Sequence, residues 1–226
     1  MKVLLFDLGQ TLIENVSIDL VNGFISLFGD KLSTSELQAE LMHLITQFKE
    51  RSHRELLIID AINEIMERRN LDLGENIENR FLNAVEVDKA IDGVGEVLND
   101  LKQQGFYLGV ISNTIFSGQA MKQRLFDLGY PDVFSFVLTS ADATYRKPYQ
   151  EIFQKALSII QQDLPDAKME DVYFVGDSYE IDVLGCMNAG MKPIWLNVKD
   201  EKQNYAGLEI KNLSELKELA DKNMIK

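Results

Sequence analysis

Short apolar runs recur along the chain without the strict alternation of a half-exposed strand. Their residues are mainly β-branched, aromatic or leucine. Uninterrupted apolar positions of this kind are typical of strands that are covered on both faces. Five such runs stand at residues 3–6, 107–111, 134–138, 172–175 and 193–196. They predict a parallel sheet buried between layers of helices.

Amphipathic stretches separate most of these runs. Residues 94–104 place Val94, Val97, Leu98 and Leu101 on one helical face, and Gly105 follows as a stop signal. Residues 149–161 repeat this spacing. Strands that alternate with helices favour an α/β fold with a doubly wound parallel sheet, similar to a Rossmann core.

The stretch between the first two strands interrupts this alternation, and its pattern predicts helix throughout residues 13–90. Ser33 and Glu36 have the spacing of a capping box before an amphipathic segment, and further helices are predicted at 54–69 and 75–87. A connection of this length is too long for an ordinary loop. We therefore expect a core of residues 1–13 and 90–226, with residues 14–89 inserted as a helical cap.

Composition narrows the possible partners. The chain has 23 basic and 36 acidic residues, a net charge of −13, which disfavours nucleic acid and anionic membranes as partners. The single cysteine, Cys186, cannot form an intramolecular disulfide. No apolar run approaches the ~20 residues needed to span a bilayer. We expect a cytoplasmic protein, and the sequence predicts nothing about its oligomeric state.

Polar residues follow directly after several of the predicted strands. Asp7 ends the first run, Ser112 and Asn113 the second, and Gly176 and Asp177 the fourth. In an open α/β sheet, ligands bind outside the carboxyl ends of the strands. We therefore expect these residues, although distant in sequence, to converge on one site.

Four segments together resemble the motifs of the haloacid dehalogenase superfamily, and they occur in the same order. They are Phe-Asp-Leu-Gly-Gln-Thr-Leu at 6–12, Val-Ile-Ser-Asn-Thr at 110–114, Arg-Lys-Pro at 146–148 and Val-Gly-Asp-Ser-Tyr-Glu-Ile-Asp at 175–182. The inserted helical region resembles the type 1 cap of that superfamily in its position. The resemblance covers nearly the whole chain.

This resemblance implies a hydrolase, with a phosphatase of a small phosphorylated metabolite as the leading hypothesis. Asp7 would be the nucleophile and would form an aspartyl-phosphate. Ser112 and the backbone N–H of Asn113 would hold the phosphoryl oxygens. Lys147 would contact the substrate and balance the negative charge of the site.

The resemblance also implies Mg²⁺ as cofactor. Asp7 and Asp177 would supply carboxylate ligands, and the backbone carbonyl of Gly9 a third oxygen. Asp182 would orient the groups around the metal.

One position departs from the pattern of the superfamily's phosphatases. They have a second aspartate two residues after the nucleophile, which serves as general acid and base, and here that position is Gly9. Loss of such a group typically costs ~10²–10⁴-fold in rate. Either the substrate has a good leaving group, such as an acyl phosphate, or another residue supplies the function. His43, His53 and Glu14 are candidates.

A glycine at position 9 is also compatible with a different reaction or with the loss of catalysis. A dehalogenase or phosphonatase needs no acid at this position. However, the dehalogenases lack the acidic metal motif, and the phosphonatases use a cap lysine. Lys49 is the only lysine well inside the predicted cap, Lys31 lies nearer its first loop, and nothing marks either as activated. Alternatively, the protein has lost efficient catalysis and retains only binding.

Overall fold

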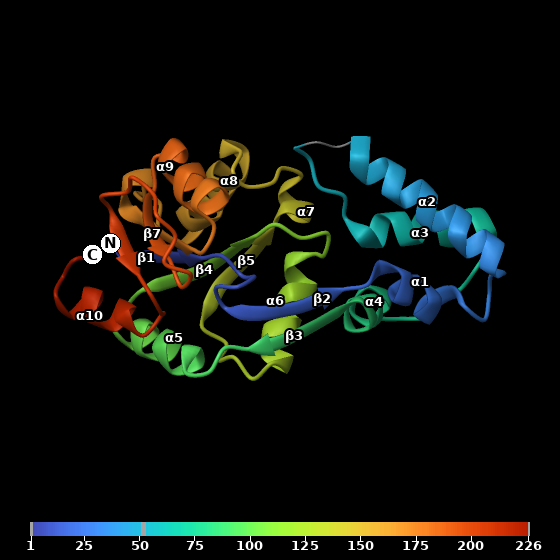
Figure 1. Cartoon of the computed structure of the whole chain (residues 1–226), viewed down its shortest axis with the longest axis horizontal. Helices are drawn as coiled ribbons and strands as arrows, with labels where there is room; N and C mark the ends of the chain where they lie inside the picture. Colours follow the sequence, from blue (N-terminus) through green and yellow to red (C-terminus); the bar gives the residue numbers. More distant parts are fainter. Residues whose placement is uncertain (1, 51–52, 226) are drawn as a thin grey trace.

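The computed structural model describes residues 2–50 and 53–225, and a six-stranded sheet lies in the part of the molecule that is on the left in Figure 1. All neighbouring strands in this sheet are parallel, in the order β5-β4-β1-β6-β7-β8. The strands are β1 (Val3–Phe6), β4 (Tyr107–Ser112), β5 (Phe134–Thr139), β6 (Val172–Gly176), β7 (Lys192–Leu196) and β8 (Leu208–Ile210). The five predicted strands are confirmed. The short edge strand β8 was not predicted.

Both faces of β1 are buried, which explains its uninterrupted apolar pattern. Leu4 and Phe6 belong to one hydrophobic cluster, and Val3 and Leu5 to another. The first cluster includes residues of α5 (Val94–Gln103), α6 (Gly118–Asp127) and α10 (Glu215–Asp221). The second includes residues of α8 (Gln150–Asp163) and α9 (Gly185–Ala189). The sheet therefore lies between two helical layers, as a doubly wound fold requires.

Shorter helical segments complete the core. They are α7 (Ser140–Ala143) after β5, the 3₁₀ turn η1 (Met169–Asp171) before β6, and the π-helical turn η2 (Tyr179–Leu184) between β6 and α9. The helices predicted at 94–104 and 149–161 correspond to α5 and α8.

Four helices form a separate group beyond one end of the sheet (Figure 1). They are α1 (Leu20–Phe28), α2 (Thr34–Glu50), α3 (Ile58–Arg69) and α4 (Ile77–Val85). The predicted capping box is present, because the Ser33 N–H donates to Glu36 Oε2 (2.9 Å) and the Glu36 N–H donates to Ser33 Oγ (3.4 Å). The division of the chain at residues 14 and 89 stays a prediction.

The prediction of helix throughout residues 13–90 was wrong at both ends. There, β2 (Ile13–Ile18) and β3 (Glu86–Ala90) pair as an antiparallel ribbon that joins the helical group to the core (Figure 1). Each strand obtains its backbone hydrogen bonds from the other, so neither can be recognised from its own sequence. No helix within the described ranges is long and apolar enough to cross a membrane.

Aromatic side chains pack α1 against α4 in the helical group, within the same hydrophobic cluster that includes Leu4 and Phe6 of β1. Phe24 stacks on Phe28 and meets Phe81 edge-to-face, with ring centroids 5.7 and 5.5 Å away. Gly23 allows α1 to approach α4 closely. A Cβ atom at this position would lie 2.8 Å from the Phe81 ring and closer still to Val85.

We predict that Gly23→Ala destabilises the protein, although alanine is the better helix former by ~1 kcal/mol. The added methyl group would overpack the contact between α1 and α4, and overpacking costs ~1–3 kcal/mol. Thermal unfolding measures the effect. Gly95→Ala in α5 is the matched control, because its Cβ would meet nothing nearer than Pro131 at 3.5 Å. A Gly23→Ala protein at least as stable as the control would contradict the prediction.

Candidate active site

The predicted site residues meet where the order of the sheet reverses. From β1 the chain adds β4 and β5 on one side and β6, β7 and β8 on the other. Asp7 follows β1, and its N–H donates to the Val175 carbonyl of β6 (2.8 Å). Ser112 ends β4, and Asp177 follows β6. A reversal of this kind opens a crevice at the carboxyl ends of the strands.

Three carboxylates and one buried lysine form the centre of this site. Asp7, Asp177 and Asp182 each offer an oxygen, and these oxygens lie within 4.8 Å of one another. We call these residues the acidic cluster. The Lys147 ammonium donates to Asp7 Oδ1 (2.5 Å) and Asp182 Oδ1 (2.8 Å), and its side chain is 1% exposed. One ammonium balances only part of the negative charge of three carboxylates.

The electrostatics of the cluster follow from burial and from this imbalance. Burial raises the pKa of Asp7 to about 7, with Lys147 opposing the rise and Asp182 adding to it. Burial also raises the pKa of Asp177, again with a contribution from Asp182. For Lys147, burial acts to lower the pKa, but Asp182 and Asp7 outweigh it and the net shift is upward. The cluster therefore favours additional positive charge.

The Asn113 side chain holds Lys147 in place through the lysine backbone. Asn113 Oδ1 accepts from the Lys147 N–H (2.7 Å), and Asn113 Nδ2 donates to the Lys147 carbonyl (2.9 Å). This pair fixes the Arg-Lys-Pro segment against the end of β4. The side chain of Asn113 is thus committed, and its predicted contact with substrate through the backbone N–H stays a prediction, as does the role of Ser112.

Both carboxylate oxygens of Asp182 accept hydrogen bonds, which orient its side chain. One accepts from Lys147, and the other accepts from the Ser178 N–H at the start of η2 (3.1 Å). Its close approach to β6 depends on Gly176, where a Cβ atom would lie 2.5 Å from the Asp182 carboxylate. This contact gives a physical reason for glycine before Asp177.

A tight turn follows Asp7 and places Gly9 beside it. The Leu8 carbonyl accepts from the N–H groups of Leu12 (2.8 Å) and Ile13 (2.9 Å), and Gln10 adopts a left-handed conformation with φ of 59°. Gly9 and Asp7 both line the same cavity. The role of the Gly9 carbonyl as a metal ligand stays a prediction.

The cavity that contains the acidic cluster has a volume of about 510 Å³. We call it the catalytic cavity. Its polar lining beyond the cluster and Lys147 includes Ser112, Thr114, Arg146 and Glu55, and its walls are otherwise mostly apolar: Leu8, Ile13, Leu20, Ile115, Phe116, Met121 and Ile181. Such walls suit a ligand with apolar surface.

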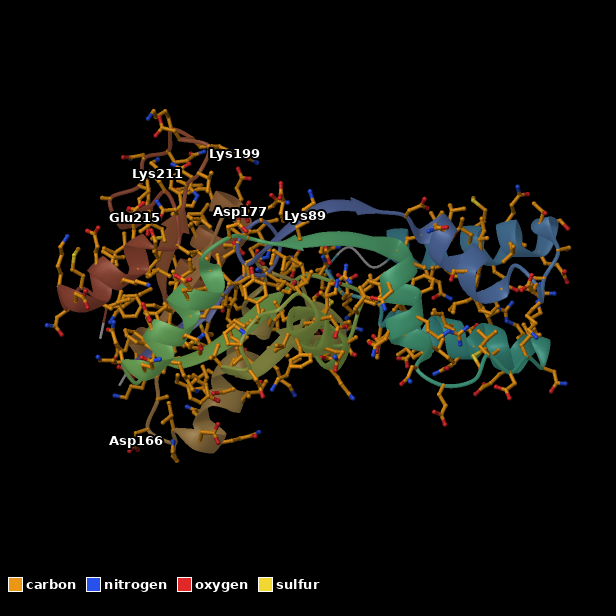
Figure 2. All side chains as sticks on the ribbon, turned by 90° about the horizontal axis from the view of Figure 1, so that it is seen from below. Lys89, Asp166, Asp177, Lys199, Lys211 and Glu215 are labelled. Atoms are coloured by element: carbon orange, nitrogen blue, oxygen red, sulfur yellow. The ribbon has the colours of Figure 1, made fainter. Side chains whose placement is uncertain are left out.

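A larger cavity of about 730 Å³ lies on the other side of Asp177. Lys89, Lys199 and Lys211 line it, and Figure 2 labels them together with Asp177. Its lining does not include Asp7 among the residues that the structure describes. Asp7, the predicted nucleophile, lines the smaller cavity, and we therefore expect the chemistry there.

The three candidates for the missing acid–base group, His43, His53 and Glu14, do not lie in the catalytic cavity as the structure describes it. His43 is exposed on α2 and contacts Gln47 (2.9 Å), and His53 is exposed near the rings of Tyr145 and Tyr149. Neither lines the catalytic cavity as described. Glu14 lines the larger cavity instead. Sequence reasoning did not single out Glu55, which lines the catalytic cavity, because a glutamate just before a helix ordinarily indicates only an exposed terminus.

Comparisons with known proteins agree with this architecture. The family of haloacid dehalogenase-like hydrolases matches residues 4–196. The glyceraldehyde 3-phosphate phosphatase of Methanothermobacter thermautotrophicus is 35% identical over 130 residues, 54% of each chain. The pyrimidine 5′-nucleotidase YjjG of Escherichia coli is 33% identical over 138 residues, 61% of this chain and 58% of that protein. The chain thus spans about half the length of the curated relatives it matches.

Solved structures share the fold over nearly the full chain. A 2-haloacid dehalogenase from Pseudomonas syringae has a TM-score of 0.65 at 24% identity, covering 98% of this chain and 99% of that one. A phosphatase from Thermococcus onnurineus has a TM-score of 0.61 at 22% identity, covering 97% and 98%. At these identities the likeness shows the fold alone. The family match itself takes in most of the sequence, and the chain therefore belongs to the haloacid dehalogenase-like hydrolases.

Proposed function

We propose that this protein is a Mg²⁺-dependent phosphatase of a small phosphorylated metabolite, acting through an aspartyl-phosphate on Asp7. The observation that carries the proposal is the buried acidic cluster with Lys147 at the point where the sheet order reverses. The curated relatives support it, because a glyceraldehyde 3-phosphate phosphatase and a pyrimidine 5′-nucleotidase both remove phosphate.

The donor set fits a hard divalent cation. Mg²⁺ prefers oxygen ligands, and the cluster offers three carboxylate oxygens within 4.8 Å of one another. Asp7, Asp177 and the Gly9 carbonyl would hold the ion, and Asp182 would orient this set. Bound there, Mg²⁺ would offset the repulsion between the phosphoryl oxygens and the carboxylates.

The side chains then have separate tasks. Asp7 attacks phosphorus with the carboxylate oxygen that does not contact Lys147, and the bond from phosphorus to the leaving oxygen breaks. The Lys147 ammonium fixes the nucleophile through Asp7 Oδ1. Ser112 and the Asn113 N–H bind the phosphoryl oxygens, where charge increases in the transition state. The apolar walls keep bulk water from the reacting atoms.

The alternatives receive less support. The dehalogenases of the superfamily lack the acidic metal motif, whereas the acidic cluster is present here. For a phosphonatase, Lys147 is the one lysine among the described lining residues of the catalytic cavity, and it is paired with Asp7 and Asp182. Lys31 is exposed beyond α1, and the side chain of Lys49 lies outside the described part. A protein that only binds would not require a buried ammonium against the nucleophile.

We predict that the wild type releases phosphate from aryl phosphates and acetyl phosphate with Mg²⁺ and loses this activity in EDTA. Asp7→Asn should lower kcat/KM by at least ~10³-fold, because an amide is a poor nucleophile. Asp166→Asn changes an exposed aspartate far from the site (Figure 2) and should leave the rate unchanged. If the wild type released no phosphate from any member of a broad metabolite panel, this result would contradict the proposal.

The glycine at position 9 gives a second test. Gly9→Asp should raise kcat by ~10-fold or more for alkyl phosphates and less for aryl phosphates, because an added acid helps poor leaving groups most. Parallel rate measurements with both substrate types check this. An inert variant, together with an inert wild type that binds a partner tightly, would favour a protein that only binds.

The charge balance in the acidic cluster gives a third test of the proposal. Lys147→Met should lower the free energy of unfolding by about 3–5 kcal/mol in EDTA, because it leaves buried carboxylates uncompensated. Mg²⁺ should restore part of this loss. Lys122→Met is the control, since the Lys122–Asp132 pair is exposed and worth at most ~1 kcal/mol. Equal losses in the two variants, by chemical denaturation, would show that Lys147 does not neutralise the cluster.

A further inference from the structure

Glu55 brings a fourth acidic side chain into the catalytic cavity. It belongs to the loop between α2 and α3, far in sequence from the other cavity carboxylates, and is 6% exposed. Backbone hydrogen bonds attach this loop to the core, from the Glu55 N–H to the Thr144 carbonyl (2.8 Å) and from the Ile58 N–H to the Ile115 carbonyl (2.9 Å). The carboxylate therefore has a fixed position at the edge of the site.

The two oxygens of Glu55 have different surroundings. Oε2 accepts a hydrogen bond from Ser140 Oγ (3.0 Å) and lies 3.4 Å from Arg146 Nε. Oε1 has no hydrogen-bond partner among the described residues. Among the described residues, only Thr11 has a fully buried side-chain oxygen or nitrogen without a hydrogen-bond partner. Glu55 Oε1 lacks a partner but is not in this class, so it is not fully buried in the protein interior. Because Glu55 lines the catalytic cavity, this oxygen is available to a molecule bound there.

The other carboxylates of the cavity already have tasks. Asp7 and Asp182 are paired with Lys147, and Asp177 belongs to the predicted metal set. Glu55 is the carboxylate outside the acidic cluster among the described lining residues. Gly9 leaves the site without the proton acceptor that hydrolysis of an acyl phosphate needs. A buried carboxylate with one oxygen anchored and one open supplies the missing chemistry.

We infer that Glu55 is the general base that activates water in the second half of the reaction, an inference that rests on the proposed function. The water oxygen forms a bond to the phosphorus of phosphorylated Asp7. The bond from phosphorus to the Asp7 oxygen breaks, and its electron pair returns to the Asp7 carboxylate. The proton of the water passes to Glu55 Oε1 and is later released to solvent together with phosphate.

This assignment leaves the first half-reaction without an acid. The leaving oxygen departs with its electron pair, so substrates whose leaving groups are stable as anions react faster. Arg146 and Ser140 hold Glu55 by the oxygen that does not react. Glu55 thus acts on the attacking water and not on the leaving group.

Glu55→Gln tests this role, because the amide keeps the shape of the side chain and can accept from Ser140 but cannot take a proton. With p-nitrophenyl phosphate and Mg²⁺, the variant should release one nitrophenol per chain at a near wild-type burst rate. Steady turnover should then fall by ~10²–10⁴-fold. Intact-mass measurement should find the chain carrying one phosphoryl group, which is absent from Asp7→Asn.

The matched control is Glu40→Gln, which removes another buried glutamate of the helical group. Glu40 is 2% exposed and paired with Arg68 and Arg69, so its loss tests for general destabilisation. It should not accumulate phosphoenzyme. If Glu55→Gln does not fold, Glu55→Asp keeps the charge but withdraws the oxygen, and should show the same accumulation to a smaller extent.

The outcomes separate the two proposals. Wild-type turnover by a folded Glu55→Gln, or equal losses of burst and turnover, would overturn the role of Glu55 and leave the phosphatase intact. A wild type that forms no phosphorylated Asp7 and releases no phosphate would overturn both.

Discussion

The ion pairs of Lys147 with Asp7 and Asp182 are the contacts on which the rest of the site depends. A buried ammonium is strongly unfavourable unless its partners remain in place, and each partner comes from a different segment. The pairs therefore fix the end of β1, the loop before α8 and the η2 turn relative to one another. Asn113 adds the end of β4 through the lysine backbone. Four distant segments are thereby held in one arrangement.

The central sheet and the acidic cluster could be predicted from the sequence for a physical reason. Strands buried on both faces must be apolar throughout, so their positions are visible without knowledge of their partners. The topology of such a sheet then brings the residues at the strand ends together. Asp7 and Asp177 could be assigned to one site on these grounds, and the motif resemblance supplied Lys147 and Asp182.

Features that depend on pairing between distant segments could not be predicted from the sequence. The whole helical group separates β2 from β3 in the sequence, although the two strands are hydrogen-bonded to each other. The edge strand β8 has only three residues and pairs with β7. Glu55 belongs to the same class. Its burial arises from Ser140, Thr144 and Arg146, whereas its local sequence is that of an ordinary loop before a helix.

The position of β1 has a consequence for how the chain folds. This strand is the first of the described strands in sequence order but lies in the middle of the sheet, between β4 and β6. Its partners begin at Tyr107 and Val172, so its hydrogen bonds close only after most of the chain has been synthesised. Contacts so distant in sequence form slowly, and an unpaired apolar strand is prone to aggregate meanwhile. Among the described strands, the one that precedes Asp7 therefore remains without its partners for the longest time during synthesis.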